Sequence, residues 1–344
     1  MTRVAAIDCG TNTIRLLIAE ADRDRSGRPR LEVLRRRNEI VRLGQGVDRT
    51  GVLNPEALER TLTVVDAYAT DCDELGVAPG EAVRRFVATS ATRDARNRED
   101  FVTGVRRLLG VEPEVVSGQE EARLSFSGSL LGARGGEDSG VREGSECAQT
   151  PRLVVDLGGG STELVLGVDA PSAAISLDTG SVRITERFLT GGVTPETEAA
   201  ARAEVRGLLD DAERVVDLSA PGQLVGLAGT ITTVTAHALG LQAFDPQALN
   251  GAELSPDAVL SSCEAIVHST AEQRASWGYL APGRRDVIAA GALVWSEVVT
   301  RVVERTAAAA GRPLERVTTS LYDILDGIAL SLVPAQAALE GDEA

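Results

Sequence analysis

Hydrophobic residues along this chain follow two patterns: short apolar runs, and longer stretches in which apolar positions recur every three or four residues. The runs over residues 4–7 and 16–19 predict a β-hairpin, and residues 31–43 predict further extended chain. A helix is expected to begin at Asn54 and Pro55, because asparagine caps helices and proline suits their first turn. Gly76 is expected to end that helix.

The alternation of strands and helices continues along the chain, which predicts an α/β fold. Because a hairpin followed by β/α units occurs in both halves, we expect a duplicated fold. Residues 132–151 interrupt the pattern with Gly, Ser and charged residues, which predicts a flexible surface loop. The other predicted strands lie at 83–88, 115–116, 153–155, 164–167, near 175, 224–228 and 316–319, and the other helices at 98–109, 182–189, 195–218, 256–268, 287–304 and after 320.

Charge and composition narrow the class of protein. The chain carries 35 Lys and Arg against 51 Asp and Glu, a formal net charge of −16, so we expect no nucleic-acid partner and no membrane partner. Its 344 residues suffice for about two domains. The cysteines form no C-x-x-C pair, which argues against a zinc site or a disulfide framework. We therefore expect a cytoplasmic protein, and a homodimer stays open.

Two similar glycine turns, at residues 8–15 and 156–163, each join a predicted strand to a returning strand. Glycine exposes backbone N–H groups there, which makes a cradle for an anion. One such turn is common in ordinary hairpins, but two of the same layout favour facing domains that share a phosphate ligand. The carboxylates of Asp8 and Asp156 would repel bare phosphate, so we expect a divalent cation that bridges carboxylate and phosphate. The predicted phosphate-binding residues are Gly10, Thr11, Asn12, Thr13 and Arg15 in the first turn and Gly158, Gly159, Gly160 and Ser161 in the second.

Arginines at strand ends are the expected partners of the phosphate oxygens. Arg15 and Arg93 each follow a glycine or hydroxyl turn, and Arg183 is a third candidate. A single arginine is most often a surface residue, so the prediction concerns the cluster. A further strand-to-helix turn at residues 229–233 offers N–H groups to a phosphate or base, or is a plain helix cap.

Adjacent glutamates at the start of a predicted helix supply a candidate general base. Side chains of neighbouring helical residues diverge by about 100°, so only one of Glu120 and Glu121 can point into a given cleft. Glu120 lies three residues before Arg123, which favours a surface ion pair. Glu121 shares its face with Ser125 and a glycine, which leaves room for a ligand. The alternative is two solvated glutamates favoured by the helix dipole.

Several strings of the chain follow one another in the order of a known family's motifs. They are D-C-G-T-N-T-I-R at 8–15, A-T-S-A-T-R at 88–93, S-G-Q-E-E-A at 117–122 and D-L-G-G-G-S-T-E at 156–163, with later strings at 180–183, 226–230 and 282–286. In this combination the chain resembles the Ppx/GppA family of exopolyphosphatases and guanosine pentaphosphate phosphohydrolases, in a short two-domain form.

The resemblance implies an actin-like, Hsp70-like and sugar-kinase-like fold. Two ribonuclease-H-like domains would hold the active site in the cleft between them, and the last helix would fold back onto the first domain. We therefore expect a first domain over residues 1–125, completed by a C-terminal helix at about 320–336. The second domain is expected over residues 126–319.

The resemblance also implies a reaction, the hydrolytic removal of the terminal phosphate from inorganic polyphosphate with release of orthophosphate. It implies that Glu121 is the catalytic residue and that the glycine turns and Arg93 hold the phosphate oxygens. Mg²⁺ would lie near Asp8, Asp156 and Glu163. Long members of the family carry an additional C-terminal helical region, whereas few residues follow the last predicted helix here. The resemblance therefore implies short polyphosphate, or the 5′ end of guanosine pentaphosphate, as substrate. A kinase of the same superfamily and a non-catalytic alarmone sensor stay as alternatives.

Overall fold

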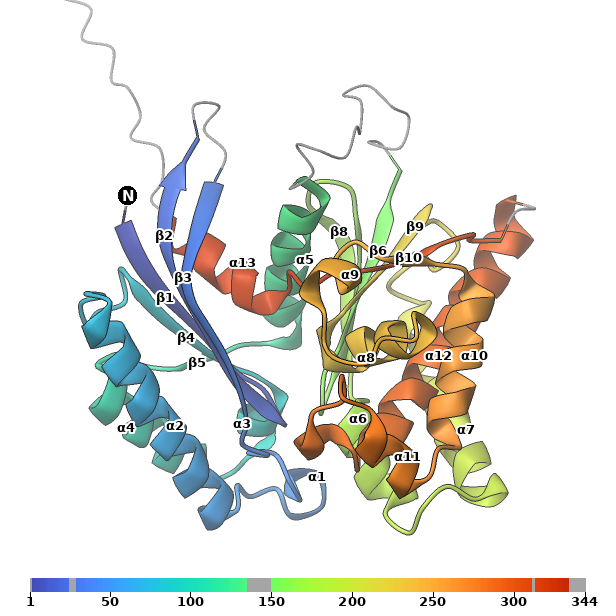
Figure 1. The fold of residues 1–344 in the computed structure, drawn as a ribbon, viewed down its shortest axis with the longest axis horizontal. Coiled ribbons are helices and arrows are strands. Elements are labelled where there is room, and N and C mark those ends of the chain that lie inside the picture. Colours follow the sequence, from blue (N-terminus) through green and yellow to red (C-terminus); the bar gives the residue numbers. More distant parts are fainter. Residues whose placement is uncertain (1, 25–28, 135–149, 311–312, 334–344) are drawn as a thin grey trace, which may run out of the picture.

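The computed structural model describes residues 2–24, 29–134, 150–310 and 313–333, and it arranges them in two lobes (Figure 1). We call the five-stranded sheet with its helices the first lobe and the six-stranded sheet with its helices the second lobe. The predicted α/β class, with two lobes and a pocket between them, is confirmed. Of the predicted loop over 132–151, residues 135–149 lie outside the described chain, while residues 132–134 belong to a helix.

The first sheet is built around the predicted hairpin, with strand order β3-β2-β1-β4-β5. Strands β1, β2 and β3 are antiparallel, whereas β4 lies parallel to β1 and β5 parallel to β4. The hairpin register places Asp8 opposite Arg15, just before the first glycine turn. The strands are β1 (Thr2–Cys9), β2 (Thr13–Arg23), β3 (Pro29–Ile40), β4 (Arg84–Ala88) and β5 (Glu114–Val115).

The second sheet repeats this arrangement, with strand order β10-β11-β9-β6-β7-β8. Its hairpin β6–β7 continues antiparallel into β8, and β9 lies parallel to β6, which agrees with the expected duplication. At the position equivalent to the Asp8–Arg15 pair, Asp156 lies opposite Glu163. The strands are β6 (Arg152–Leu157), β7 (Thr162–Gly167), β8 (Pro171–Leu177), β9 (Gln223–Leu227), β10 (Glu253–Leu254) and β11 (Val317–Thr319).

The helices follow the predicted pattern, with differences at their ends. The helix expected over 182–189 is a short α-helix that continues as a π-helix, the one expected over 195–218 ends at Ala212, and the one expected over 287–304 runs on to Ala310. The helices are α1 (Val47–Thr50), α2 (Pro55–Glu74), α3 (Ser90–Asp94), α4 (Arg98–Leu109), α5 (Gly118–Arg134), α6 (Ser181–Ile184), the π-helix η2 (Thr185–Leu189), α7 (Pro195–Ala212), α8 (Ala228–Ala238), α9 (Pro246–Leu249), α10 (Pro256–Val267), α11 (Ala271–Ser276), the 3₁₀ turn η3 (Pro282–Arg284), α12 (Ile288–Ala310) and α13 (Ile324–Ser331).

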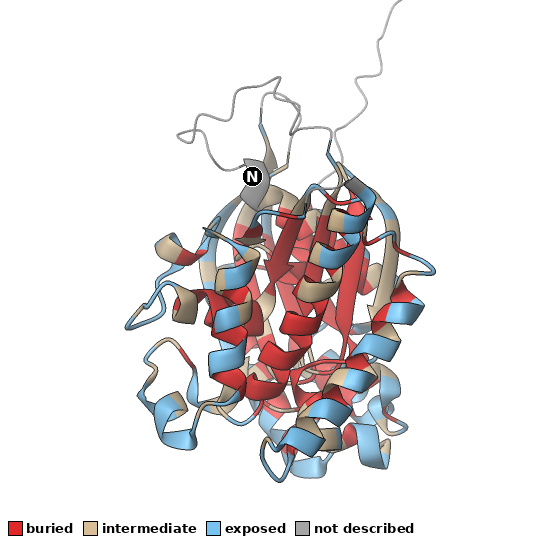
Figure 2. Ribbon diagram, turned by 90° about the vertical axis from the view of Figure 1, so that its right-hand side faces the viewer, coloured by how far each residue is buried: buried red, intermediate tan, exposed pale blue. Residues whose placement is uncertain are grey.

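Each lobe has its own apolar core between its sheet and the covering helices. In the first lobe the Asn54 side chain caps α2 by accepting from the Glu56 N–H, and Val65 of that helix is fully buried against the sheet. In the second lobe the core gathers around Trp295 of α12. Figure 2 shows the strands buried and the exposed residues on the outward faces of the helices. No helix in the described residues is both long and apolar enough to cross a membrane.

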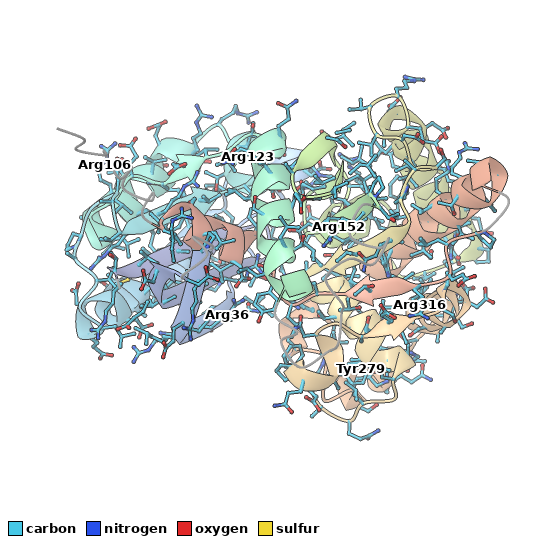
Figure 3. The ribbon with its side chains drawn as sticks, turned by 90° about the horizontal axis from the view of Figure 1, so that it is seen from above. Arg36, Arg106, Arg123, Arg152, Tyr279 and Arg316 are labelled. Atoms are coloured by element: carbon cyan, nitrogen blue, oxygen red, sulfur yellow. The ribbon has the colours of Figure 1, made fainter. Side chains whose placement is uncertain are left out.

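Helix α5 stands between the lobes, with α13 beside it on the first lobe (Figures 1 and 3). Its Ala122 and Phe126 pack on the second sheet, whereas Leu124 packs with α13 on the first sheet. The backbones of α5 and α13 approach so closely that a Cβ at Gly128 would overlap the Asp323 carbonyl group. A boundary after residue 125 falls inside this continuous helix, and the domain limits stay a prediction.

Candidate active site

A cavity of about 100 Å³ lies between the lobes, where the strands of both hairpins lead into the glycine turns. The residues predicted for the site line this cavity, with the exceptions of Arg93 and the third candidate arginine, Arg183. These lining residues are Asp8, Gly10, Thr11, Asn12, Thr13, Arg15, Glu121, Asp156, Gly158, Gly159, Gly160, Ser161 and Glu163.

The first glycine turn keeps its carbonyl groups occupied and leaves N–H groups free. The Asn12 carbonyl accepts from the N–H groups of Val41 and Arg42 at 3.0 and 2.9 Å. The Thr11 carbonyl accepts from the Gly44 N–H at 2.8 Å. Among the described residues, the N–H groups of Thr11 and Asn12 have no acceptor, so this turn offers donors to an anion.

The second glycine turn is built in the same way. The carbonyl groups of Gly158 and Gly159 accept from backbone N–H groups of residues 181–183, at 2.9 to 3.1 Å. The Gly160 carbonyl accepts from Nε of Arg183 at 2.8 Å. Within the described chain, the N–H groups of residues 159–161 lack an acceptor. Both turns therefore present N–H groups and few carbonyl oxygens to a ligand.

The two turns also touch each other across the lobes. The hydroxyl groups of Thr11 and Ser90 lie 2.9 Å apart, and a Cβ on Gly160 would come within 2.5 and 2.6 Å of them. Only glycine leaves room for this approach. The donors of both turns consequently meet at one cavity.

Four buried carboxyl groups face the cavity, and their pKa values are raised. Burial, together with neighbouring Asp8 and Asp156, raises the pKa of Glu121 to about 8. Burial and neighbouring carboxylates raise the pKa of Asp156 to about 6, and burial also raises the pKa of Glu163 and of Asp8. The Ser125 hydroxyl donates to Asp156 at 2.6 Å, and the Ser176 hydroxyl donates to Glu163 at 2.7 Å.

This set of donors fits a hard divalent cation. Carboxylate oxygens are the ligands that Mg²⁺ prefers, and the predicted ligands Asp8, Asp156 and Glu163 line one cavity. Oδ1 of Asp8 is buried without a hydrogen-bond partner in the described structure. Among the described residues, four carboxyl groups but two arginines, Arg15 and Arg284, line the cavity. A bound cation would therefore also reduce the repulsion between the carboxylates.

Glu121 lies in the first turn of α5 and is 7% exposed as a residue, whereas Glu120 points away and pairs with Arg123 at 2.8 Å. The divergence expected for these neighbours is thus observed. Nη1 of Arg93 donates to Glu121 at 3.3 Å and to the Val116 carbonyl at 3.0 Å. Arg93, predicted to bind phosphate, therefore lies against the candidate base rather than on the cavity wall.

The model of the Ppx/GppA phosphatase family matches residues 18–315 of this chain. The chain belongs to the Ppx/GppA phosphatase family. Exopolyphosphatase 2 of Mycobacterium tuberculosis is 43% identical over 340 residues, which cover 96% of this chain and 99% of that protein. The crystal structure of an exopolyphosphatase-like protein is 41% identical with a TM-score of 0.85, over 96% of this chain and 97% of that one. The Aquifex aeolicus Ppx/GppA enzyme is 28% identical with a TM-score of 0.70, over 96% and 99% of the two chains.

The structure of this Ppx/GppA protein adds residues that the sequence did not single out. Arg15 donates from Nε and Nη2 to Asp8, at 3.0 and 2.6 Å, and from Nη1 to Asp323. Asp323 is 308 residues away and also caps α13 by accepting from the Leu325 N–H. No local pattern marks such a contact, so sequence reasoning missed Asp323.

Arg284 is a second missed residue. Its string at 282–286 resembled a family motif, but no role was assigned to it. The guanidinium lies over Gly229, where a Cβ would overlap it, and it lines the cavity. Burial and the nearby Arg15 lower the pKa of Arg284 to about 10. Since the side chain makes no hydrogen bond or ion pair in the described part of this Ppx/GppA protein, it is available to an anionic ligand.

The raised pKa values predict a pH dependence of stability for the cation-free protein. The pKa of Glu121 rises from 4.5 to about 8, so the folded state holds this proton more tightly than the unfolded state. The stabilisation is complete below about pH 4.5 and is lost as the pH rises through 8, at about 1.4 kcal/mol for each unit of pKa difference. Urea unfolding between pH 5 and 9 with a chelator should show a falling free energy of unfolding, with a smaller fall in Glu121→Gln. An equal fall in both proteins would contradict the assignment.

Proposed function

We propose that this Ppx/GppA protein is an exopolyphosphatase that hydrolyses the terminal phosphate of inorganic polyphosphate. The observation that carries the proposal is the convergence of two glycine turns and one buried glutamate on a single cavity. Relatives named exopolyphosphatase, similar to this chain over nearly its whole length, support the same substrate.

In the proposed reaction the side chains hold and activate the reactants. Glu121 accepts a proton from a water molecule that attacks the terminal phosphorus atom. As the new P–O bond to the water oxygen forms, the P–O bond between the terminal phosphorus and the bridging oxygen breaks. The bridging oxygen keeps the electron pair and stays on the shortened polyphosphate, and the terminal group is released as orthophosphate. The free N–H groups of both turns and the guanidinium of Arg284 bind the non-bridging oxygens, while Arg93 orients Glu121.

The proposal includes Mg²⁺ held by Asp8, Asp156 and Glu163. Its clearest support is Oδ1 of Asp8, a buried carboxylate oxygen without a hydrogen-bond partner among the described residues. When bound, the cation would offset negative charge on the phosphates. Arg15 cannot neutralise this charge fully, because its guanidinium is already shared between Asp8 and Asp323.

A second candidate substrate is guanosine pentaphosphate, and a groove beside the cavity favours it. The groove has a volume of about 1180 Å³ and shares Arg15, Gly229 and Arg284 with the phosphate cavity. Phe244, 52% exposed, and Tyr322 also line it. An exposed aromatic ring beside a phosphate site suits a nucleobase, which bare polyphosphate lacks.

An assay of orthophosphate release tests both candidates. The protein is incubated with Mg²⁺ and, separately, short polyphosphate, long polyphosphate and guanosine pentaphosphate. We expect the fastest release from short polyphosphate, loss of release with a chelator, and recovery with excess Mg²⁺. Faster release from guanosine pentaphosphate would favour the second candidate, and a folded protein that releases phosphate from none of them would refute the proposed enzyme.

The proposal places the enzyme in the cytoplasm. The described cysteines Cys9, Cys72 and Cys263 are all unpaired and buried. Unpaired cysteines fit a reducing compartment.

A further inference from the structure

Arg183 lies where the second glycine turn meets the first lobe. The residue is 9% exposed, and its guanidinium joins three groups. Nε donates to the Gly160 carbonyl at 2.8 Å, Nη1 to Asp48 at 2.5 Å and Nη2 to Asp94 at 2.8 Å. A fourth group, Asp178, lies 3.8 Å from Nη2. One side chain thus connects the glycine turn with α1 and α3 of the first lobe.

The contact with Gly160 determines which way one peptide group faces. Because a peptide unit is planar and trans, its carbonyl and the following N–H point in opposite directions. Holding the Gly160 carbonyl toward Arg183 therefore directs the Ser161 N–H the other way. Ser161 lines the phosphate cavity, and its N–H has no acceptor in the described structure.

The other carbonyl groups of this turn do not depend on a side chain in the same way. Those of Gly158 and Gly159 are bonded to backbone N–H groups of residues 181–183. The Gly160 peptide is held by the guanidinium of Arg183. Removing that side chain would free one peptide of the turn to rotate while the rest stays bonded.

The contact with Asp94 reaches the candidate base. Asp94 follows Arg93 in α3, and Arg93 donates to Glu121. Arg183 therefore fixes the second glycine turn relative to the helix that orients the base. Arg183 itself does not line the phosphate cavity, so it touches neither the reacting phosphate nor the water.

We propose that Arg183 is a positioning residue, which orients the Ser161 N–H toward the terminal phosphate and holds the second glycine turn against the first lobe. This inference rests on the proposed phosphatase function. It replaces the sequence-based expectation that Arg183 contacts phosphate oxygens directly.

Arg187 provides a matched control. It donates from Nε and Nη2 to the same Asp48, at 2.7 and 2.8 Å, and from Nη1 to Glu204 at 3.0 Å, but it makes no hydrogen bond to the glycine turn. A variant of Arg187 removes a comparable ion pair between the lobes and leaves the Gly160 contact in place. The comparison separates the orientation of the turn from ion pairing alone.

The test compares Arg183→Gln, Arg183→Lys and Arg187→Gln with the wild type, by kcat, by KM for short polyphosphate, and by calorimetric binding of inorganic phosphate with Mg²⁺. We expect Arg183→Gln to lower kcat/KM about 10- to 100-fold, somewhat less than the roughly 10²–10³-fold cost of losing a whole donor, and to weaken phosphate binding. Arg187→Gln should stay within about twofold of the wild type, because the Gly160 contact remains and an ion pair near the surface contributes little. Arg183→Lys should fold and be impaired, because one ammonium group cannot reach all three partners.

Several results would overturn the inference. One is equal impairment in Arg183→Gln and Arg187→Gln, since ion pairing would then suffice. Another is wild-type kinetics and phosphate binding in Arg183→Lys, which remains informative even if Arg183→Gln fails to fold. A wild type that binds phosphate but releases none from polyphosphate would refute the proposed function alone, because calorimetry still compares the Arg183 variants without turnover. Absence of phosphate binding by the wild type would overturn both.

Discussion

Replacing Glu121 by glutamine is expected to lower kcat for polyphosphate hydrolysis by about 10²–10⁴-fold, the usual range for the loss of a general base. Glutamine keeps the size of the side chain and can still hydrogen-bond, but it cannot take a proton from water. KM should change by only a few-fold, because the N–H groups of the two glycine turns are untouched. Measuring kcat and KM separately by orthophosphate release distinguishes the two effects.

Glu120→Gln is the matched control. Glu120 is the adjacent residue on the same helix turn, but it pairs with Arg123 and Arg85 outside the cavity. Its variant should keep wild-type turnover. If Glu121→Gln retained more than a tenth of wild-type kcat, Glu121 would not be the base. A pure alarmone sensor would be insensitive to the change, as it has no turnover to lose.

Replacing Gly128 by alanine is expected to destabilise the protein by about 1–3 kcal/mol or more, the cost of overpacking a tight contact. The added methyl group would meet the carbonyl of Asp323 and the N–H of Gly327, which belong to backbone and cannot rotate away. Helix α5 would have to move away from α13. Because α5 carries Glu121 and Asp323 binds Arg15, we also expect a loss of activity.

Gly207→Ala serves as the control for this change. Gly207 lies within α7, and a Cβ there would meet nothing within 4 Å. Alanine should therefore stabilise that helix by about 0.5–1 kcal/mol. Chemical denaturation of both variants and the wild type provides the comparison. Equal stability of Gly128→Ala and the wild type would mean that the helices separate easily, contrary to the structure.

The sequence was most informative where local chemistry determines local structure. The glycine turns, the hairpins that lead into them and the helical position of Glu121 all follow from residues within a few positions of one another. The assignment of Glu163 as a metal ligand depended on the family resemblance and stays a prediction. The register places Glu163 where Arg15 lies in the first hairpin, a correspondence that the sequence analysis did not use.

Sequence patterns do not identify contacts between residues that are far apart in the chain. Arg93 follows a strand end, as phosphate-binding arginines do. Its guanidinium hydrogen-bonds to the Val116 carbonyl and to Glu121, and Arg93 does not line the cavity. Arg284 is distinguished by making no hydrogen bond or ion pair in the described structure although it lines the cavity, a property that no spacing reveals. The partner of Arg15 in α13 is 308 residues distant in sequence, and only folding brings it near.

The packing of α13 has a consequence for biosynthesis. Ala6 of β1, Leu17 of β2 and Val87 of β4 are covered by Ile324 and its neighbours, which are synthesised long after these three strands. This apolar face of the first sheet is therefore exposed to solvent in the nascent chain until α13 has been synthesised. Contacts so distant along the chain slow folding and leave nascent intermediates prone to aggregation. Newly made chains of this protein should accordingly depend on chaperones until α13 has docked.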